Sequence, residues 1–200
     1  MSAADVGWRF GLHVPEGWVD VDLSLPEDLR FRAIDEAVDA LVAAEPGFSD
    51  DAVRMKNAAW SVVADAVAQR AMVAAVGFER AAGATAPMSV VAHQLAGDAP
   101  IDVEALARSL EDSHPRDITG REVTIVELPA GPAVRVHAIS EGGDAAGGPL
   151  PVVEGVDHFI PVPGTPDMLL LVASTPAVAI GDLALPVFDA IAATVGFLPA

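Results

Sequence analysis

Residues 8–21 read WRFGLHVPEGWVDV, and this stretch decides the fold. Its first half alternates apolar residues with polar or small ones, as a half-buried strand does; the apolar positions are Trp8, Phe10, Leu12 and Val14. Pro15-Glu16-Gly17 has the composition of a tight turn, and a second alternation begins at Val19. We therefore expect two paired N-terminal strands, and we expect both to lie in the same sheet as the strand at 168–174.

A helical hairpin is predicted at 27–70, directly after these strands. Ser24 is expected to cap its first helix, because Glu27 follows three residues later as in a capping box. Apolar residues then recur at helical spacing: Phe31, Ile34, Val38, Leu41 and Val42. The end of the second helix is open between Arg70, which leaves a strand from residue 72, and Val76, which continues the helix.

The rest of the chain predicts strands around one short helix. Strand patterns occupy 72–80, 87–95, 122–128, 133–140, 152–161 and 168–174. The short helix is expected at 103–111. Residues 168–172 are apolar at every position, so their strand is expected at the centre of the sheet. The Gly- and Ala-rich segment 141–150 is expected to be a flexible loop.

A final helix is expected from Pro186, with Gly196 as its left-handed cap. Phe188 belongs to its apolar face and is predicted to be a buried anchor. Asp189 is expected on the solvated side, where its replacement by alanine changes stability by less than about half a kcal/mol.

These elements predict one α+β domain over 1–200, with a largely antiparallel sheet covered by helices and the helical hairpin inserted after the first two strands. Both ends of the chain resemble the PsbP-like family. The positions that carry the resemblance are Phe10, Leu12, Val14, Pro15, Gly17, Trp18, Phe188, Asp189, Ile191 and Phe197. The resemblance implies an α/β/α sandwich with Trp18 in its core. It also implies a non-enzymatic interaction or assembly role with a protein partner, as an accessory to bacterial secretion machinery.

Composition excludes several function classes. The chain has no Cys, so disulfides, thiol nucleophiles and Cys-ligated zinc are excluded. Its net charge is -18, and no Lys or Arg follows Arg135, so we expect binding to neither nucleic acid nor anionic membranes. The most apolar run, 168–180, is interrupted by Pro176 and is too short to span a bilayer. No basic region precedes an apolar stretch at the start, and the expected location is cytoplasmic.

No catalytic, metal or cofactor site is predicted. Four of the five histidines fall on expected strands without the spacing of a zinc motif; the five are His13, His93, His114, His137 and His158. The glycines of 142–148 lack the Lys-Ser/Thr that completes a phosphate loop. Trp18, with Asp20 and Asp22 on the same strand face, is the candidate partner-binding site, although a packing role for Trp18 is favoured. The alternative function is a small-molecule carrier with a pocket between helices and sheet.

Overall fold

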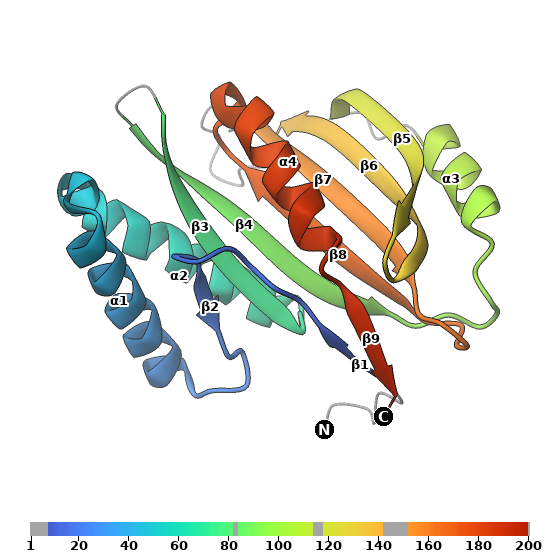
Figure 1. The fold of residues 1–200 in the computed structure, drawn as a ribbon, viewed down its shortest axis with the longest axis horizontal. Coiled ribbons are helices and arrows are strands. Elements are labelled where there is room, and N and C mark those ends of the chain that lie inside the picture. Colours follow the sequence, from blue (N-terminus) through green and yellow to red (C-terminus); the bar gives the residue numbers. More distant parts are fainter. Residues whose placement is uncertain (1–7, 82–83, 114–117, 142–151, 200) are drawn as a thin grey trace.

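A seven-stranded antiparallel sheet forms the centre of the computed structural model, which describes residues 8–81, 84–113, 118–141 and 152–199. The strands are β1 (Trp8–Gly11), β2 (Val19–Val21), β3 (Val73–Ala81), β4 (Ala84–Leu95), β5 (Ile118–Leu128), β6 (Gly131–Glu141), β7 (Val152–Pro161), β8 (Met168–Thr175) and β9 (Gly196–Pro199). The helices are α1 (Glu27–Ala44), α2 (Ala52–Ala68), α3 (Val103–Asp112) and α4 (Gly181–Ala192), with short 3-10 turns at Pro46–Asp51 and Val178–Ile180. Figure 1 shows their arrangement.

The strand order is β2-β3-β4-β8-β7-β6-β5, and every neighbouring pair is antiparallel. The strands predicted at 122–174 form the meander β5-β6-β7-β8. Strand β8 is fourth of the seven, so its predicted central place is confirmed. Alternate residues of this strand, Leu169, Leu171 and Ala173, are buried, and the apolar residues between them are half-buried.

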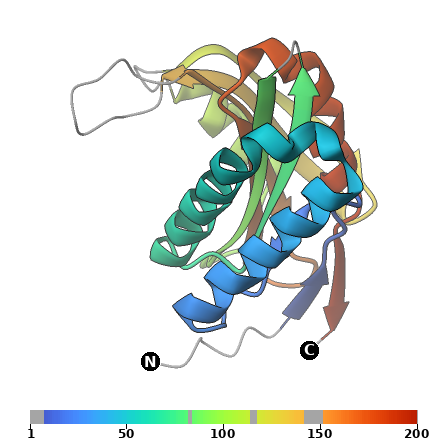
Figure 2. The same cartoon turned by 90° about the vertical axis from the view of Figure 1, so that its left-hand side faces the viewer.

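Helices cover both faces of the sheet (Figure 2). We call one side the α4 face, because α4 packs there against β7 and β8. On the other side α1 and α2 cover β2, β3 and β4, and α3 covers β5 and β6. We call this side the α3 face. Val91, which packs with the α1–α2 cluster, is linked by cross-strand pairing through Val172 and Asp157 to Val136, which packs under α3. The predicted α+β sandwich is therefore confirmed.

The helical hairpin has its predicted place, and α2 ends near Arg70. Helix α2 stops at Ala68, and Arg70 adopts a left-handed conformation with φ 58°. A residue in this region ends a helix, so the strand alternative from residue 72 is the one the molecule adopts. Ser24 does not cap α1. It donates its backbone N–H and its hydroxyl to Asp22 Oδ1, and Pro26 occupies the N-cap position.

The expected pairing of the two N-terminal strands is wrong. The turn itself forms, with Trp18 N–H donating to the Pro15 carbonyl and Gly17 at φ 84°. Its two flanking segments nevertheless separate, since β2 pairs with β3 while β1 pairs with β9 in a two-stranded sheet of its own. Edge-to-face contact between Trp8 and Phe197 favours this partner, with ring centroids 5.6 Å apart.

The predicted start and end of the final helix are also wrong. Helix α4 begins at Gly181 and holds Pro186 in its interior. Burial of Ala184 before that proline explains the longer helix, because packing outweighs the hydrogen bond that proline removes. Gly196 starts β9 and does not cap the helix, which ends at Ala192 with Ala193 at its C-cap position. The buried position predicted for Phe188 is confirmed at 0% exposure.

The loop expected at 141–150 lies outside the described residues except at its first position, which ends β6. The short predicted helix corresponds to α3. Its N-cap is Asp102, whose carboxylate accepts from the backbone N–H groups of Glu104 and Ala105 at 3.0 and 3.1 Å.

Candidate functional site

The three residues predicted to bind a partner lie at alternate positions in and beside β2 and differ in their exposure. Trp18 is half-buried and packs into the cluster on the α4 face, over Gly77, where even a Cβ would collide with its indole ring. Asp20 and Asp22 are exposed. Hydrogen bonds from the hydroxyl and backbone N–H of Ser24 lower the pKa of Asp22, so this carboxylate already has a local structural partner. A partner-binding role for Trp18, Asp20 and Asp22 stays a prediction.

A polar cluster lies beneath α4. Arg135 on β6 donates from Nε and Nη2 to the two carboxylate oxygens of Asp189 at 2.8 and 3.1 Å, and His158 Nε2 lies 3.2 Å from Asp189 Oδ1. Burial alone raises the pKa of Asp189, but the hydrogen bonds from His158 and Arg135 outweigh it and hold the pKa at about 2. Asp189 is therefore an anchor of α4 on the sheet, which corrects the solvated role expected for it.

A second pair extends this cluster toward the start of α4. His137 Nε2 lies 2.9 Å from Glu154 Oε1, and the Glu154 carboxylate is buried against Gly181, the first residue of the helix. A carboxylate at that position is favoured by the positive end of the helix dipole. Each acid in the cluster thus has a cation, an imidazole or a helix end beside it, and the arrangement joins α4 to the sheet.

The histidines do not assemble a metal site among the described residues, in which no group of three His, Asp or Glu side chains has suitable geometry. His137 and His158 lie on neighbouring strands, but each has its own carboxylate partner. His93 is partly buried on β4, and this desolvation lowers its pKa. His13 is exposed, and His114 lies outside the described residues.

One carboxylate on the α3 face is perturbed in the opposite direction. Burial raises the pKa of Asp157 to about 6, and the positive charge of Arg121 only partly offsets this effect. Asp157 stands in the middle of the sheet, between Val136 and Val172 in the cross-strand register. The Arg121 guanidinium donates from Nη1 to the Ser113 carbonyl, while its buried Nε has no hydrogen-bond partner.

A groove lies between α3 and β5 on this face. Helix α3 packs onto the sheet through one side, where Val103, Leu106 and Leu110 contact Val134, Val136 and Phe159. The adjacent side of the helix faces the rim of the sheet and lines a groove of about 300 Å³. The lining residues are Glu104, Ala107, Arg108, Glu111, Val123 and Ile125. None of them belongs to β6, so the groove lies at the outer side of β5.

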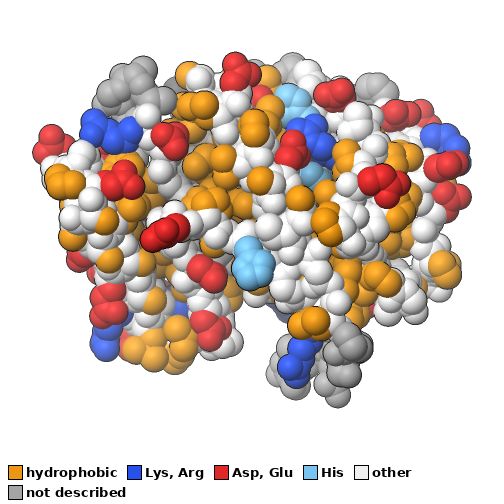
Figure 3. Space-filling model, viewed as in Figure 1, with side chains coloured by type: hydrophobic (Ala, Val, Ile, Leu, Met, Phe, Trp, Pro, Cys, Tyr) orange, Lys and Arg blue, Asp and Glu red, His pale blue; other side chains and the backbone are white. Residues whose placement is uncertain are grey.

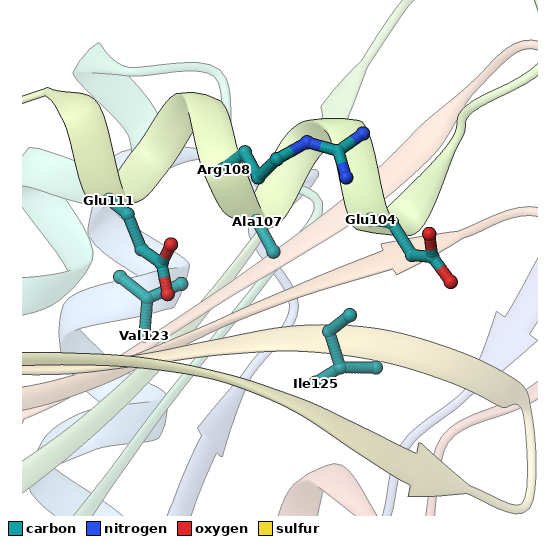
Figure 4. A pocket seen from close by; sticks show the side chains of 6 residues that line it. All are labelled: Glu104, Ala107, Arg108, Glu111, Val123 and Ile125. Carbon is teal, nitrogen blue, oxygen red and sulfur yellow. The ribbon is translucent and has the colours of Figure 1, made fainter.

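Figure 4 shows how these side chains are arranged. Ala107 points down from the helix toward β5, and Val123 and Ile125 rise from the strand to meet it, so the floor is apolar. Glu104 and Glu111 lie at the two ends of the groove, about one helical turn before and after Ala107. Ile125 is 47% exposed, which is unusual for an isoleucine on a strand that a helix covers.

Strand β5 is also the edge of the sheet. Among the described residues it pairs only with β6, so the backbone groups on its other side have no strand partner. At the opposite edge β2 has only three residues, whereas the pairing of β5 with β6 runs without interruption from Glu122 to Leu128. Before Glu122 the register shifts, and Gly120 adopts φ +62°. The regular part of this edge therefore coincides with the groove.

Two smaller hollows lie elsewhere. One, of about 240 Å³, separates α1 from α2 and is lined by Phe31, Val63 and Val67 with Glu27 and Arg30 at its mouth. The other, of about 230 Å³, lies beside Met55 and Phe78 and includes Arg54, Ala58, Thr85 and Pro87. Neither borders an unpaired strand.

Neither the groove nor the cluster under α4 is predicted from the sequence. Val123 and Ile125 carried a readable signal, because they continue the apolar alternation of a strand that has an acidic helix before it. The pairing of Arg135 with Asp189 had no such signal, since it depends on the register that sets β6 beneath α4.

The surface is acidic over the face shown in Figure 3, where Asp and Glu side chains are spread widely and Lys and Arg side chains occur at a few separate places. No continuous basic patch covers the described residues of that face. No helix in the described part of the chain is long and apolar enough to cross a membrane.

Comparison with known proteins shows a likeness of fold. No known protein family and no curated protein matches the sequence, so the PsbP-like resemblance is not confirmed. Among solved structures, the chain is similar to LpqN, described as involved in cell envelope biogenesis of Mycobacterium tuberculosis, with a TM-score of 0.50 and 11% sequence identity. The match covers 98% of this chain and 87% of LpqN. The two proteins share a fold.

Proposed function

We propose that this chain is a non-enzymatic protein-interaction module whose partner binds in the groove between α3 and β5. The observation that carries the proposal is the exposure of Ile125, which lies with the partly buried Val123 on the apolar floor of a groove along an edge strand. Exposed apolar side chains surrounded by charged ones are typical of an interaction site.

The polar groups elsewhere support a non-enzymatic role. The acids beneath α4, Glu154 and Asp189, are paired with His137, His158 and Arg135, and this cluster joins a helix to the sheet. A small-molecule carrier is supported less well. The groove volume of about 300 Å³ lies at the lower limit of ligand pockets, which span roughly 300–1,000 Å³.

The proposal includes a cytoplasmic location and an accessory role beside bacterial secretion machinery, without nucleic-acid binding or membrane insertion. The net charge of -18 supports the exclusion of nucleic acid. The involvement of LpqN in cell envelope biogenesis is compatible with an assembly role. Cell fractionation with an antibody to the native protein tests the location, and recovery outside the cytoplasmic fraction would remove that part of the proposal.

Site-specific photocrosslinking tests the binding site. A photoreactive amino acid is placed at Ile125 in the full chain, at Asp20 to test the Trp18, Asp20 and Asp22 surface, and at Val53, which is 72% exposed on α2, as a control. In extracts of the native host we expect a discrete protein adduct from position 125 and none from position 53. Equal adducts from 125 and 53 would contradict the groove, and an adduct from position 20 alone would move the site to the N-terminal strand.

Charge reversal provides a matched control. Glu104→Lys with Glu111→Lys should abolish the adduct from position 125, because both glutamates line the groove. Glu36→Lys with Asp65→Lys changes the net charge equally on the exposed sides of α1 and α2 and should leave the adduct intact. If the two double variants act alike, the effect comes from net charge and the groove is not the site.

A further inference from the structure

We propose that the partner segment is an extended, basic peptide that adds to β5 as an eighth strand of the sheet. The inference rests on the proposed function and specifies the chemistry of the partner. It follows from three features of β5. Its unpaired backbone groups point to the open edge, the side chains of the same residues line the groove, and acidic side chains lie nearby.

Pro132 on β6 shows in which direction the backbone groups of β5 point. In an antiparallel pair, positions alternate between those that exchange hydrogen bonds across the pair and those whose N–H and C=O groups point away from it. Pro132 has no N–H and lies opposite Glu127, so this is a position without cross-strand hydrogen bonds. By alternation, the same holds for Ile125 and Val123. The N–H and C=O groups of these three residues therefore point to the open edge.

The side chains of the same three residues lie on one face of the sheet. Side chains two apart on a strand share a face, so Val123, Ile125 and Glu127 all lie on the α3 face. Val123 and Ile125 form the floor of the groove. A strand bonded to their backbone would direct every second side chain into the space below α3. The edge thus offers backbone hydrogen bonds and a lined groove at one place, which are the two elements of recognition by strand addition.

The charges around the groove favour a basic partner segment. Three glutamates lie on this side of the sheet: Glu104 and Glu111 on α3, and Glu127 on β5. All three are exposed, and Arg108 is the one cation among the residues that line the groove. A second copy of this chain would bring the same three carboxylates against them, so self-pairing is disfavoured. Lysine or arginine at alternate positions of a partner segment would complement them.

Peptide binding to the full chain tests the inference. The probe is a short fluorescein-labelled peptide in which lysine alternates with valine or threonine, and its counterpart carries glutamate in place of each lysine. Fluorescence anisotropy should show binding of the basic peptide that is at least about tenfold tighter than that of the acidic one and that weakens as salt is added. Equal binding of the two peptides would overturn the basic partner.

Backbone modification separates strand addition from attraction by charge alone. Methylating every second backbone nitrogen of the basic peptide blocks one edge of it. In one phase the methyl groups face β5 and should weaken binding by about tenfold, whereas in the other phase they face solvent and should have little effect. Equal binding in both phases would overturn strand addition.

Two substitutions at one position make the same test from the protein side. Glu127→Pro removes an outward N–H at an edge position where proline is compatible with a strand, and it should weaken binding by about tenfold. Glu127→Gln removes the charge but keeps the N–H and should have a smaller effect. Circular dichroism checks that both variants fold. If Glu127→Pro does not fold, the methylated peptides test strand addition without it.

These results are independent of the photocrosslinking experiment. If position 125 gives its groove-dependent adduct but the two methylation phases bind alike, the interaction module stands and the extended partner is wrong. If the adduct is absent as well, the groove itself is not a binding site.

Discussion

Charged residues have different surroundings on the two faces of the sheet. Beneath α4, Arg135 and His158 pair with Asp189 and join the helix to the sheet. Around α3, glutamates remain exposed beside an apolar floor, and the backbone of β5 lacks a partner on one side among the described residues. Paired polar groups and buried apolar ones serve stability, so we expect the α4 face to contribute strongly to folding, and we propose that the edge beside α3 serves binding.

The largest expected effect comes from breaking the α4 face. Phe188 is fully buried in the cluster that joins α4 to β8, so Phe188→Ala should lower the free energy of unfolding by about 3–5 kcal/mol. Urea denaturation followed by circular dichroism measures the change. A loss below about 1 kcal/mol would mean that α4 is not a principal support of the fold.

The stability contribution of Asp157 on the α3 face should depend on pH. Its pKa is raised to about 6, above the ordinary value of 3.8, so the folded state binds a proton more tightly than the unfolded state. Its contribution to stability is therefore lost as pH rises from about 4 to 6. Asp157→Asn should stabilise the protein by about 1–2 kcal/mol at pH 7 and have little effect at pH 4. Denaturation at both pH values checks this, and an equal effect at the two would contradict the raised pKa.

Asp189 should show the opposite pH dependence. Its pKa is lowered to about 2, so its stabilising contribution is present above the ordinary value of 3.8 and is lost as pH falls toward 2. Because the side chain is 42% exposed, solvent screens the pair, and Asp189→Asn should cost about 1 kcal/mol at pH 7. The difference in the free energy of unfolding between Asp189→Asn and the unmodified protein should become smaller as pH falls from 4 to 2. A difference that stays constant over this range would show that packing, not charge, is lost.

The smallest effect on stability is expected in the groove. Ile125→Thr keeps a β-branched residue on the strand and removes apolar surface that is already half-exposed, so the free energy of unfolding should change by less than about half a kcal/mol. Binding of the basic peptide should nevertheless weaken. A large loss of stability would place Ile125 in the core and remove the contrast between the two faces.

The sequence predicts elements better than it predicts their partners. The strand at 152–161 has the same bounds in the structure, and the central place of β8 follows from its apolar composition. The pairing of β1 with β9 was missed because alternation in residues 8–14 specifies a strand without specifying its neighbour. The groove could be predicted only in part. The sequence pattern places Ile125 on a strand, but the exposure of its side chain depends on where α3 packs.

The pairing of β1 with β9 has a consequence for synthesis. It joins the first described strand to the last, and Trp8 reaches its buried site only when Phe197 and the β7–β8 turn residue Asp167 are in place. During synthesis β1 therefore leaves the ribosome long before β9, and until then Trp8 lacks the residues against which it packs. Closing so long a loop makes this ribbon a late step, after the hairpins of the sheet have formed. A nascent chain that stalls before β9 leaves that aromatic strand available to chaperones.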